Sequence, residues 1–278
     1  MATQPVIRQN SAPMPQTTSH MVSRRDRYNP DEILEGEINQ PFFKYFENKT
    51  IPPHKEDVPT DDKWIHLGFL LDRSGSMMTF KTDGIIDSIN KFVKDQMEGK
   101  DDHKFSVTIV SFDYSVRVVF DGFIKTIDDL KITVRDIHPR GSTALVEANA
   151  FAIEYIGRKC ASWGTLEGDT RPSKIIFATM TDGEENSSED DWHGKSGQEK
   201  LSEVVKEHTD KWGWKFFFLG ANIDSRATGS IMGYDVDQCI DFHTSNEGYD
   251  VAFSSCSRAI HENRGFSQEE RNSSMNPF

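Results

Sequence analysis

Residues 64–76 read WIHLGFLLDRSGS, and this stretch carries most of the information about the fold. Its apolar run ends on Asp72, after which hydroxyl side chains follow at Ser74 and Ser76. Such a run is typical of a strand that is buried on both faces. Gly75 allows the chain to turn, so oxygens at positions i, i+2 and i+4 can converge on one point, as hard cations require. The stretch therefore predicts a buried strand that leads into a loop with converging oxygens, and the rest of the chain must supply the other ligands of a cation site.

Beyond this stretch, short apolar segments alternate with amphipathic ones. The predicted strands are Trp64–Leu71, Phe105–Phe112, Val116–Phe120, Lys174–Thr181, Trp214–Leu219 and Gln238–Phe242. The predicted helices are Thr82–Met97, Thr143–Ile156, Gln198–Lys211, Ser225–Met232 and Asn246–Asn263. Strands that are separated by helices predict an α/β fold with a doubly wound, mostly parallel sheet of six strands.

One pair of strands departs from this alternation. Only three residues, 113–115, separate Phe105–Phe112 from Val116–Phe120, and so short a connection predicts a hairpin. The strand Val116–Phe120 is therefore expected to be an antiparallel edge of the sheet.

Two further loops bring oxygen atoms to the same edge of the sheet. Asp182 follows the strand Lys174–Thr181, and Ser142 and Thr143 stand where a helix begins. Ligands of doubly wound sheets bind at the carboxyl ends of the strands, where Asp72 also lies. Two carboxylates and at least three hydroxyls, without His or Cys, favour magnesium or manganese over zinc.

Three motifs together resemble the metal-ion-dependent adhesion site of von Willebrand factor type A domains. They are Asp72-Arg73-Ser74-Gly75-Ser76, Gly141-Ser142-Thr143-Ala144-Leu145 and Thr181-Asp182-Gly183. The resemblance covers about Lys63 to Gly265 and implies a Rossmann-like fold. It also implies that Ser74, Ser76 and Thr143 contact Mg²⁺ or Mn²⁺, directly or through water, while Asp72 and Asp182 hold its waters or ligate it less directly.

The same resemblance implies a function without catalysis. In this family the cation accepts an Asp or Glu carboxylate of a protein partner, so the chain is expected to be a protein-interaction module. The later stretch WKFFFLGANIDSRATGSIMG, residues 214–233, is similar to a bacterial and phage subgroup of these domains. In bacteria and phages, domains of this family often work beside ring ATPases or stress-response proteins, which are the partners that the resemblance implies.

Composition narrows the range of partners and locations. The chain has 278 residues and a formal net charge of -13, which argues against binding to nucleic acids or to anionic membranes. It has no apolar stretch long enough for a membrane span and no signal-peptide pattern at its start. Its three cysteines are far apart and lack CxxC spacing, which favours a reducing compartment. We therefore expect a cytoplasmic protein.

The two ends of the chain differ from the middle. Residues 1–60 are polar and rich in proline, and we expect a partly disordered extension before a domain at 61–265. Within that extension, NPDEILEG predicts a short helix, and the aromatic residues of QPFFKYF leave two alternatives for residues 29–47: solvent exposure or docking on the domain. Residues 266–278 are expected to form a flexible tail.

Several features have a plain structural explanation beside a functional one. Asp72 alone could simply end a strand at a turn, but Thr143 and Asp182 favour a cation site. Asp113 is explained by a hairpin turn or by an outer ligand position. The acidic residues after Asp182 form either a solvated loop or a second, weaker cation site, and the solvated loop is the favoured explanation. Residues Gly194-Lys195-Ser196 lack the first glycine of a nucleotide-binding loop, so that interpretation is rejected.

Two functions other than a protein-interaction module stay open. A magnesium-dependent phosphoryl-transfer enzyme would use Asp72 as its nucleophile, but such enzymes carry a second Asp where this chain has Ser74, and no general base stands in a matching loop. A structural component, for instance of a virion, would use the aromatic N-terminal residues as an anchor.

Overall fold

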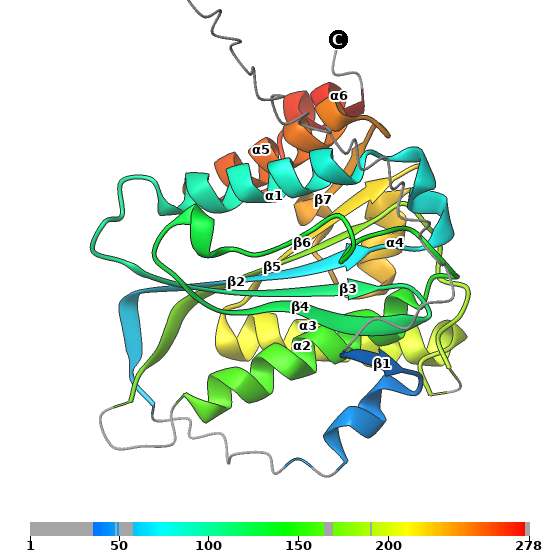
Figure 1. The fold of residues 1–278 in the computed structure, drawn as a ribbon, viewed down its shortest axis with the longest axis horizontal. Helices are drawn as coiled ribbons and strands as arrows, with labels where there is room; N and C mark the ends of the chain where they lie inside the picture. The colour runs from blue at the N-terminus through cyan, green and yellow to red at the C-terminus, as the bar shows by residue number, and fades with distance from the viewer. Residues whose placement is uncertain (1–35, 48, 50–57, 164–168, 190, 276–278) are drawn as a thin grey trace, which may run out of the picture. The chain divides into compact units, whose positions relative to one another are not determined.

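A seven-stranded sheet with the strand order β1-β4-β3-β2-β5-β6-β7 organises the computed structural model, which describes residues 36–47, 49, 58–163, 169–189 and 191–275. The strands are β1 Glu37–Asn39, β2 Thr60–Asp72, β3 Lys104–Phe112, β4 Ser115–Ile124, β5 Arg171–Thr181, β6 Lys215–Ala221 and β7 Cys239–Phe242. Strands β3, β2, β5, β6 and β7 pair in parallel, and β4 is antiparallel to β3. The predicted mostly parallel α/β fold is confirmed (Figure 1).

The predicted number of strands was six, and the seventh is β1. This strand has three residues and pairs antiparallel with the outer side of β4, so β4 is not the last strand of the sheet. A segment of three residues is too short to show a strand periodicity in the sequence. Of the segment 29–47, residues 36–47 are described. The helix predicted for NPDEILEG lies outside the described residues except for its last glycine.

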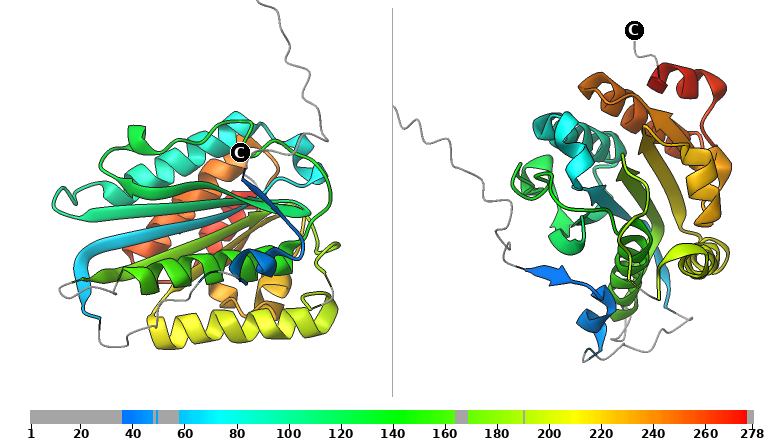
Figure 2. Two further views of the ribbon diagram at one scale, coloured as in Figure 1. Left: turned by 60° about the horizontal axis from the view of Figure 1, so that its bottom comes forward. Right: turned by 90° about the vertical axis from the view of Figure 1, so that its right-hand side faces the viewer.

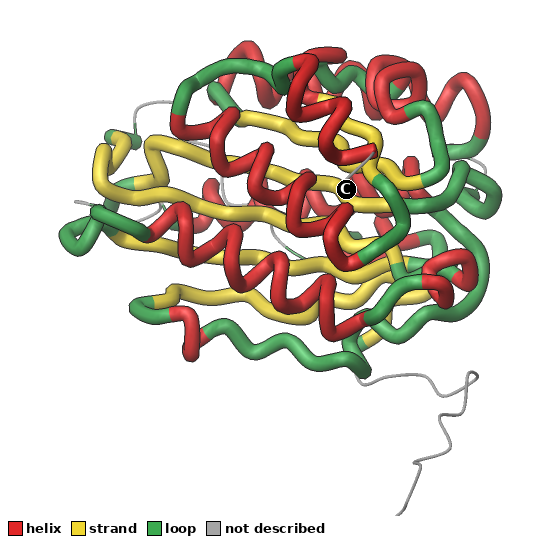
Figure 3. The backbone as a smooth tube through the Cα atoms, turned by 90° about the horizontal axis from the view of Figure 1, so that it is seen from above, coloured by secondary structure: helices red, strands yellow, loops and turns green. Residues whose placement is uncertain are grey.

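Helices cover both faces of the sheet in two layers. The α-helices are α1 Thr82–Met97, α2 Leu145–Ser162, α3 Gly194–Trp212, α4 Ser225–Ile231, α5 Asn246–His261 and α6 Gln268–Met275. Helices α1 and α5 pack together on one face, and α2 and α3 pack together on the other (Figure 2). Seen from above, the first of these layers lies over the strands (Figure 3). Short 3-10 helices occupy Phe42–Phe46, Gly75–Thr79, Ile127–Asp129 and Val236–Gln238.

The central strand β2 separates two hydrophobic cores. Phe69 and Leu71 point into the core beneath α1 and α5, whereas Leu70 points into the core beneath α2 and α3. Alternate residues of a strand face opposite sides of a sheet, so a strand covered on both sides must be apolar throughout. This double burial explains the continuous apolar run in the sequence, and it makes the end of β2 the point where the chain leaves the cores.

The flexible tail expected at residues 266–278 is wrong for Gln268–Met275, which form α6. The buried residues of this helix are the polar Glu270 and Ser274, which bond to α5 and to β7. Because its contacts are hydrogen bonds and ion pairs, the helix lacks the apolar periodicity by which a packed helix is recognised in a sequence.

Candidate metal centre

The five predicted ligands lie on three loops at one edge of the sheet. Asp72 ends β2, and Asp182 follows the last residue of β5, which is the parallel neighbour of β2. Thr143 lies in the loop that precedes α2, where Ala144 and not Thr143 is the N-cap residue. The expected helix start at Thr143 is therefore two residues too early, and Thr143 is free of a capping role.

The first loop holds its oxygens by local hydrogen bonds. Asp72 Oδ1 accepts from the backbone N–H of Ser74 at 2.6 Å, and Asp72 Oδ2 accepts from the Thr181 hydroxyl at 2.5 Å. The hydroxyl oxygens of Ser74 and Ser76 lie 3.0 Å apart. A Cβ at Gly75 would stand 3.2 Å from the carbonyl oxygen of Gly141, so glycine permits the close approach of the second loop.

The second and third loops complete the group. The Ser76 hydroxyl donates to Asp182 Oδ1 at 2.6 Å. A Cβ at Gly183 would lie 3.0 Å from Thr143 Oγ1 and 3.4 Å from Ser76 Oγ, so both hydroxyls flank this glycine. Asn186 anchors Thr143, because its Oδ1 accepts from the Thr143 N–H at 2.8 Å. The structure thus brings all five predicted residues together.

Burial dominates the electrostatics of the two carboxylates. Burial raises the pKa of Asp72 to about 7, against the hydrogen bonds from Thr181 and Ser74, and the charge of Asp182 acts in the same direction as burial. Burial also raises the pKa of Asp182, against the bond from Ser76. Neither carboxylate takes part in an ion pair with any other described residue.

This donor set fits a divalent cation. Two buried carboxylates without a basic partner need a positive charge, and the hydroxyls of Ser74, Ser76 and Thr143 are neutral oxygen ligands beside them. The Tyr249 hydroxyl of α5 is buried and has no hydrogen-bond partner among the described residues. Its pKa lies well above the ordinary value, through burial first and then through the charges of Asp182 and Asp72, so it lies within their field. It would be available as a donor to a water of an ion bound at this centre.

Sequence reasoning missed three residues of this centre. Thr181 directly precedes Asp182 within a quoted motif, and its place at the carboxyl end of β5 was a usable signal. Asn186 lies four residues after Asp182 in the same loop, so its place near a predicted ligand was a signal that it could contact the centre. Tyr249 is far away in the sequence, and no local pattern points to it.

The two open alternatives for neighbouring acids can now be compared with the structure. Asp113 is fully buried and accepts bonds from Ser115 and from the Arg140 guanidinium, so it belongs to an ion network and not to the metal centre. Glu185 accepts from the backbone N–H groups of Val146, Ser187 and Ser188. The remaining described acids of this loop, Glu184, Glu189 and Asp191, are exposed, as expected for a solvated loop.

Two observations concern the described residues as a group. They contain no cluster of three or more His, Cys, Asp or Glu side chains arranged for a metal, which leaves the mixed hydroxyl and carboxylate centre as the candidate site. Within the same residues, every helix is too short or too polar to cross a membrane.

Solved structures similar to this chain have low sequence identity. Proximal thread matrix protein 1 from the mussel byssus is 19% identical over 70% of this chain and 47% of its own, with a TM-score of 0.46. Another structure of that protein has a zinc-occupied adhesion-site motif. The von Willebrand factor domain of the pilus tip protein Mfa5 from Porphyromonas gingivalis is 12% identical over 76% of this chain and 99% of its own, with a TM-score of 0.48. The pilus adhesin SpaC from Lactobacillus rhamnosus GG is 13% identical over 74% and 32%, with a TM-score of 0.51.

These likenesses concern the fold alone, and the chain spans about half the length of the mussel protein. No curated protein sequence matches the chain. The family model for the von Willebrand factor type A domain matches residues 66–247, which is more than half of the chain and includes all five residues of the candidate centre. The chain belongs to the von Willebrand factor type A domain family.

Proposed function

We propose that this protein is a metal-dependent interaction module whose centre binds Mg²⁺ or Mn²⁺ and, through it, an Asp or Glu carboxylate of a protein partner. One observation carries the proposal: two buried carboxylates without a basic partner lie beside three neutral hydroxyls at an edge of the sheet. Ser74, Ser76 and Thr143 would contact the ion, and Asp72 and Asp182 would orient its waters or ligate it.

The choice of residues explains why a partner carboxylate would bind. Neutral hydroxyls leave the cation with most of its positive charge. That charge would attract the carboxylate of the partner. The chain itself carries a net charge of -13, so an acidic partner would be repelled when the cation is absent. Binding is therefore expected to switch on with the metal.

The partner class and the location are part of the same proposal. A ring ATPase or stress-response protein of a bacterium or phage would match the subgroup that residues 214–233 resemble. Three buried cysteines without a disulfide are compatible with the cytoplasm. Two observations weigh against the phosphoryl-transfer alternative: Asp72 is only 1% exposed, and both of its carboxylate oxygens already accept hydrogen bonds.

The metal can be tested without knowing the partner. Isothermal titration with Mg²⁺ should show one site in the wild type, and that site should be lost in Asp182→Ala. The matched control is Glu184→Gln, which removes a charge from an exposed position of the same loop. If Asp182→Ala binds Mg²⁺ as the wild type does, the centre is not the metal site.

The interaction needs a second experiment. Partners captured from the native host should be bound in Mg²⁺ or Mn²⁺ and released by chelator, and Ca²⁺ should substitute poorly because it requires more oxygens. Free acetate at high concentration should compete weakly. Equal capture in Mg²⁺, Mn²⁺, Ca²⁺ and chelator would show that the metal face is not the binding face.

A further inference from the structure

A buried network of four charged side chains lies directly behind the metal centre. The guanidinium of Arg73 contacts Glu37 at 2.9 Å and Asp113 at 3.3 Å, and that of Arg140 contacts Asp113 at 2.7 Å and also Glu37. The four side chains are between 0% and 3% exposed. Glu37 thus supplies one of the two carboxylates that contact both guanidiniums.

The network joins the first two metal loops. In Asp72-Arg73-Ser74 the first and third side chains take part in the centre, whereas Arg73 reaches the other side and bonds Glu37. The Arg140 N–H donates to the Arg73 carbonyl at 2.7 Å, and the Gly75 N–H donates to the Gly141 carbonyl at 3.0 Å. Glu37 thus binds one guanidinium from each of two loops whose backbones are already hydrogen-bonded.

The residues that follow Glu37 along the chain also contact the third loop. The Gln40 amide donates to the carbonyl of Ser187 at 2.7 Å and to Glu147 Oε2 at 2.9 Å. Glu147, in the first turn of α2, also accepts from the Phe42 N–H at 2.7 Å. The rings of Phe43 and Trp192 stack with centroids 5.0 Å apart.

Residues 36–47, which we call the N-terminal segment, are held on the domain by their own packing. Strand β1 pairs with β4, and Phe42 and Phe46 are buried in the core beneath α2. The family match begins at residue 66, so this segment lies outside the matched domain although it contacts all three loops of the centre.

We infer that docking of the N-terminal segment sets the metal affinity of the centre, with Glu37 and Gln40 as positioning residues that align its three loops. This inference rests on the proposed function, because it names how that centre is regulated. By linkage, a segment that favours metal binding must itself be docked more firmly when the metal is bound.

Two variants with a matched control test the inference in the full-length chain. Glu37→Gln removes a buried negative charge that contacts two guanidiniums, and Gln40→Ala removes the bonds to Ser187 and Glu147 without changing any charge. Both should weaken Mg²⁺ binding in isothermal titration by at least about tenfold. Glu47→Gln changes an exposed side chain of the same segment and should bind Mg²⁺ as the wild type does.

Hydrogen exchange measures the reciprocal effect of the metal on the N-terminal segment. If this segment only stabilised the fold, Mg²⁺ would not change the exchange rates of its amides. Saturating Mg²⁺ should slow exchange of the amides of residues 36–47 in the wild type, and should have no such effect in Asp182→Ala. If the wild type binds Mg²⁺ but both variants bind it equally well, and exchange is unchanged, this inference is overturned while the metal centre stands. If the wild type binds no Mg²⁺, both proposals fail.

Discussion

Single residues at the end of β2 take part in two separate sites. Asp72 and Ser74 face the metal centre, while Arg73 between them enters the buried ion network. This division follows from the alternation of side chains in extended backbone. A substitution at one of these positions should therefore affect one site first, and small changes at the centre should leave the fold intact.

Gly183→Ala is expected to weaken Mg²⁺ binding at least about tenfold, with little loss of stability. The added methyl group would lie 3.0 Å from the Thr143 hydroxyl, which is closer than an ordinary contact, so this proposed ligand would have to shift. It would also contact the Ser76 hydroxyl at 3.4 Å. The measurement is titration with Mg²⁺ beside thermal melting in chelator. Gly122→Ala, where a Cβ meets only two ring atoms of Phe120 at 3.6 and 3.8 Å, is the control and should bind normally.

His66 should make the protein sensitive to acid. Its side chain is fully buried, and burial, with a smaller effect of Lys159, lowers its pKa to about 3. The folded state thus holds a neutral imidazole, so the associated stability is complete above pH 6.5 and is lost as the pH falls toward 3. Between pH 7.5 and 5.0 this single group should cost about 2 kcal/mol of unfolding free energy.

Urea denaturation at those two pH values measures the effect. His66→Gln cannot gain a proton and should lose about 2 kcal/mol less than the wild type on acidification. His193→Gln, at an exposed position, should behave as the wild type does. An equal loss in wild type and His66→Gln would show that acid sensitivity arises elsewhere.

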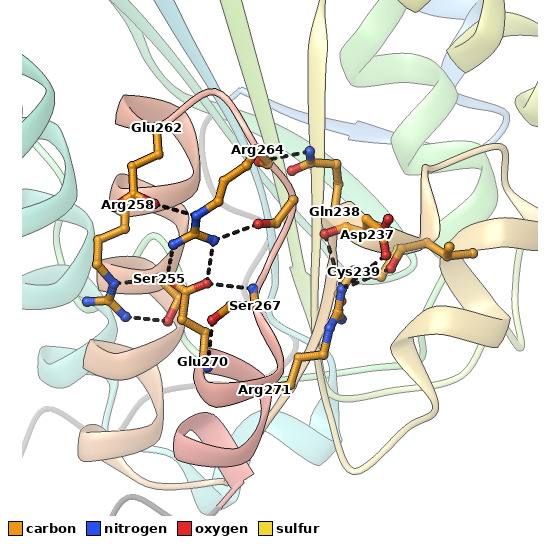
Figure 4. A network of polar contacts seen from close by, with 12 residues as sticks. Asp237, Gln238, Cys239, Ser255, Arg258, Glu262, Arg264, Ser267, Glu270 and Arg271 are labelled. Atoms are coloured by element: carbon orange, nitrogen blue, oxygen red, sulfur yellow. Dashed lines mark hydrogen bonds and ion pairs between the residues drawn. The ribbon is translucent and has the colours of Figure 1, made fainter.

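At the scale of elements, α6 closes the exposed edge of the sheet. The Arg271 guanidinium bonds the carbonyl of Cys239 in β7 (Figure 4). The Ser274 hydroxyl donates to the carbonyl of Asp241 at 2.5 Å. The N–H of His243 in turn donates to the carbonyl of Ser274 at 2.8 Å. Unpaired strand edges invite pairing with other chains, and these bonds occupy the groups that would do so.

Glu270 joins α6 to α5 in the same network. It accepts from Arg258, Arg264 and the Ser267 N–H at 2.7–2.9 Å, and it is 5% exposed. Burial acts to raise its pKa, but these donors outweigh burial and lower the pKa to about 2. The carboxylate therefore stays ionised and tied to both arginines at neutral pH.

Glu270→Gln should lower the free energy of unfolding by about 1–3 kcal/mol, because a buried acceptor of charged donors is lost while the partly exposed arginines regain water. Amide exchange at β7 should quicken as α6 detaches. Glu269→Gln, exposed on the same helix, should change neither quantity. Unchanged exchange at β7 in Glu270→Gln would mean that α6 does not protect this edge.

At the scale of the whole described domain, the three cysteines are distributed over the two hydrophobic cores, one on each face of the sheet. Cys256 lies in the core beneath α1 and α5, and Cys160 and Cys239 lie in the core beneath α2 and α3. Burial raises the pKa of Cys160 and of Cys239 to about 12 and that of Cys256 well above its ordinary value. The thiolate, which is the reactive form, is therefore scarce at neutral pH.

The native protein should not react with a thiol reagent such as dithionitrobenzoate at pH 8, and all three thiols should react together on unfolding in urea. The reaction is followed by absorbance against urea concentration, beside circular dichroism. Cooperative release of three thiols at the unfolding midpoint is the expected outcome. One thiol that reacts early would show that one face of the sheet opens on its own.

The order of strands and helices from β2 to α5 was predictable because each element carries its own periodic pattern. The five residues of the candidate centre were predictable for a related reason. Each lies within a short motif at the end of an element, and parallel strands bring their carboxyl ends to one edge. Local sequence thus determined both the mostly parallel fold and the composition of the centre.

Only the tertiary structure decided how the ends of the chain are used. Strand β1, helix α6 and the pairing of Glu37 with Arg73 and Arg140 depend on polar contacts between residues far apart in the sequence. A charged residue that is buried in an ion pair looks the same in a sequence as one that is solvated, since its burial depends on a partner which the local pattern does not reveal. For this reason the sequence determined the loops of the candidate centre, whereas the contacts that hold those loops together appeared only in the folded chain.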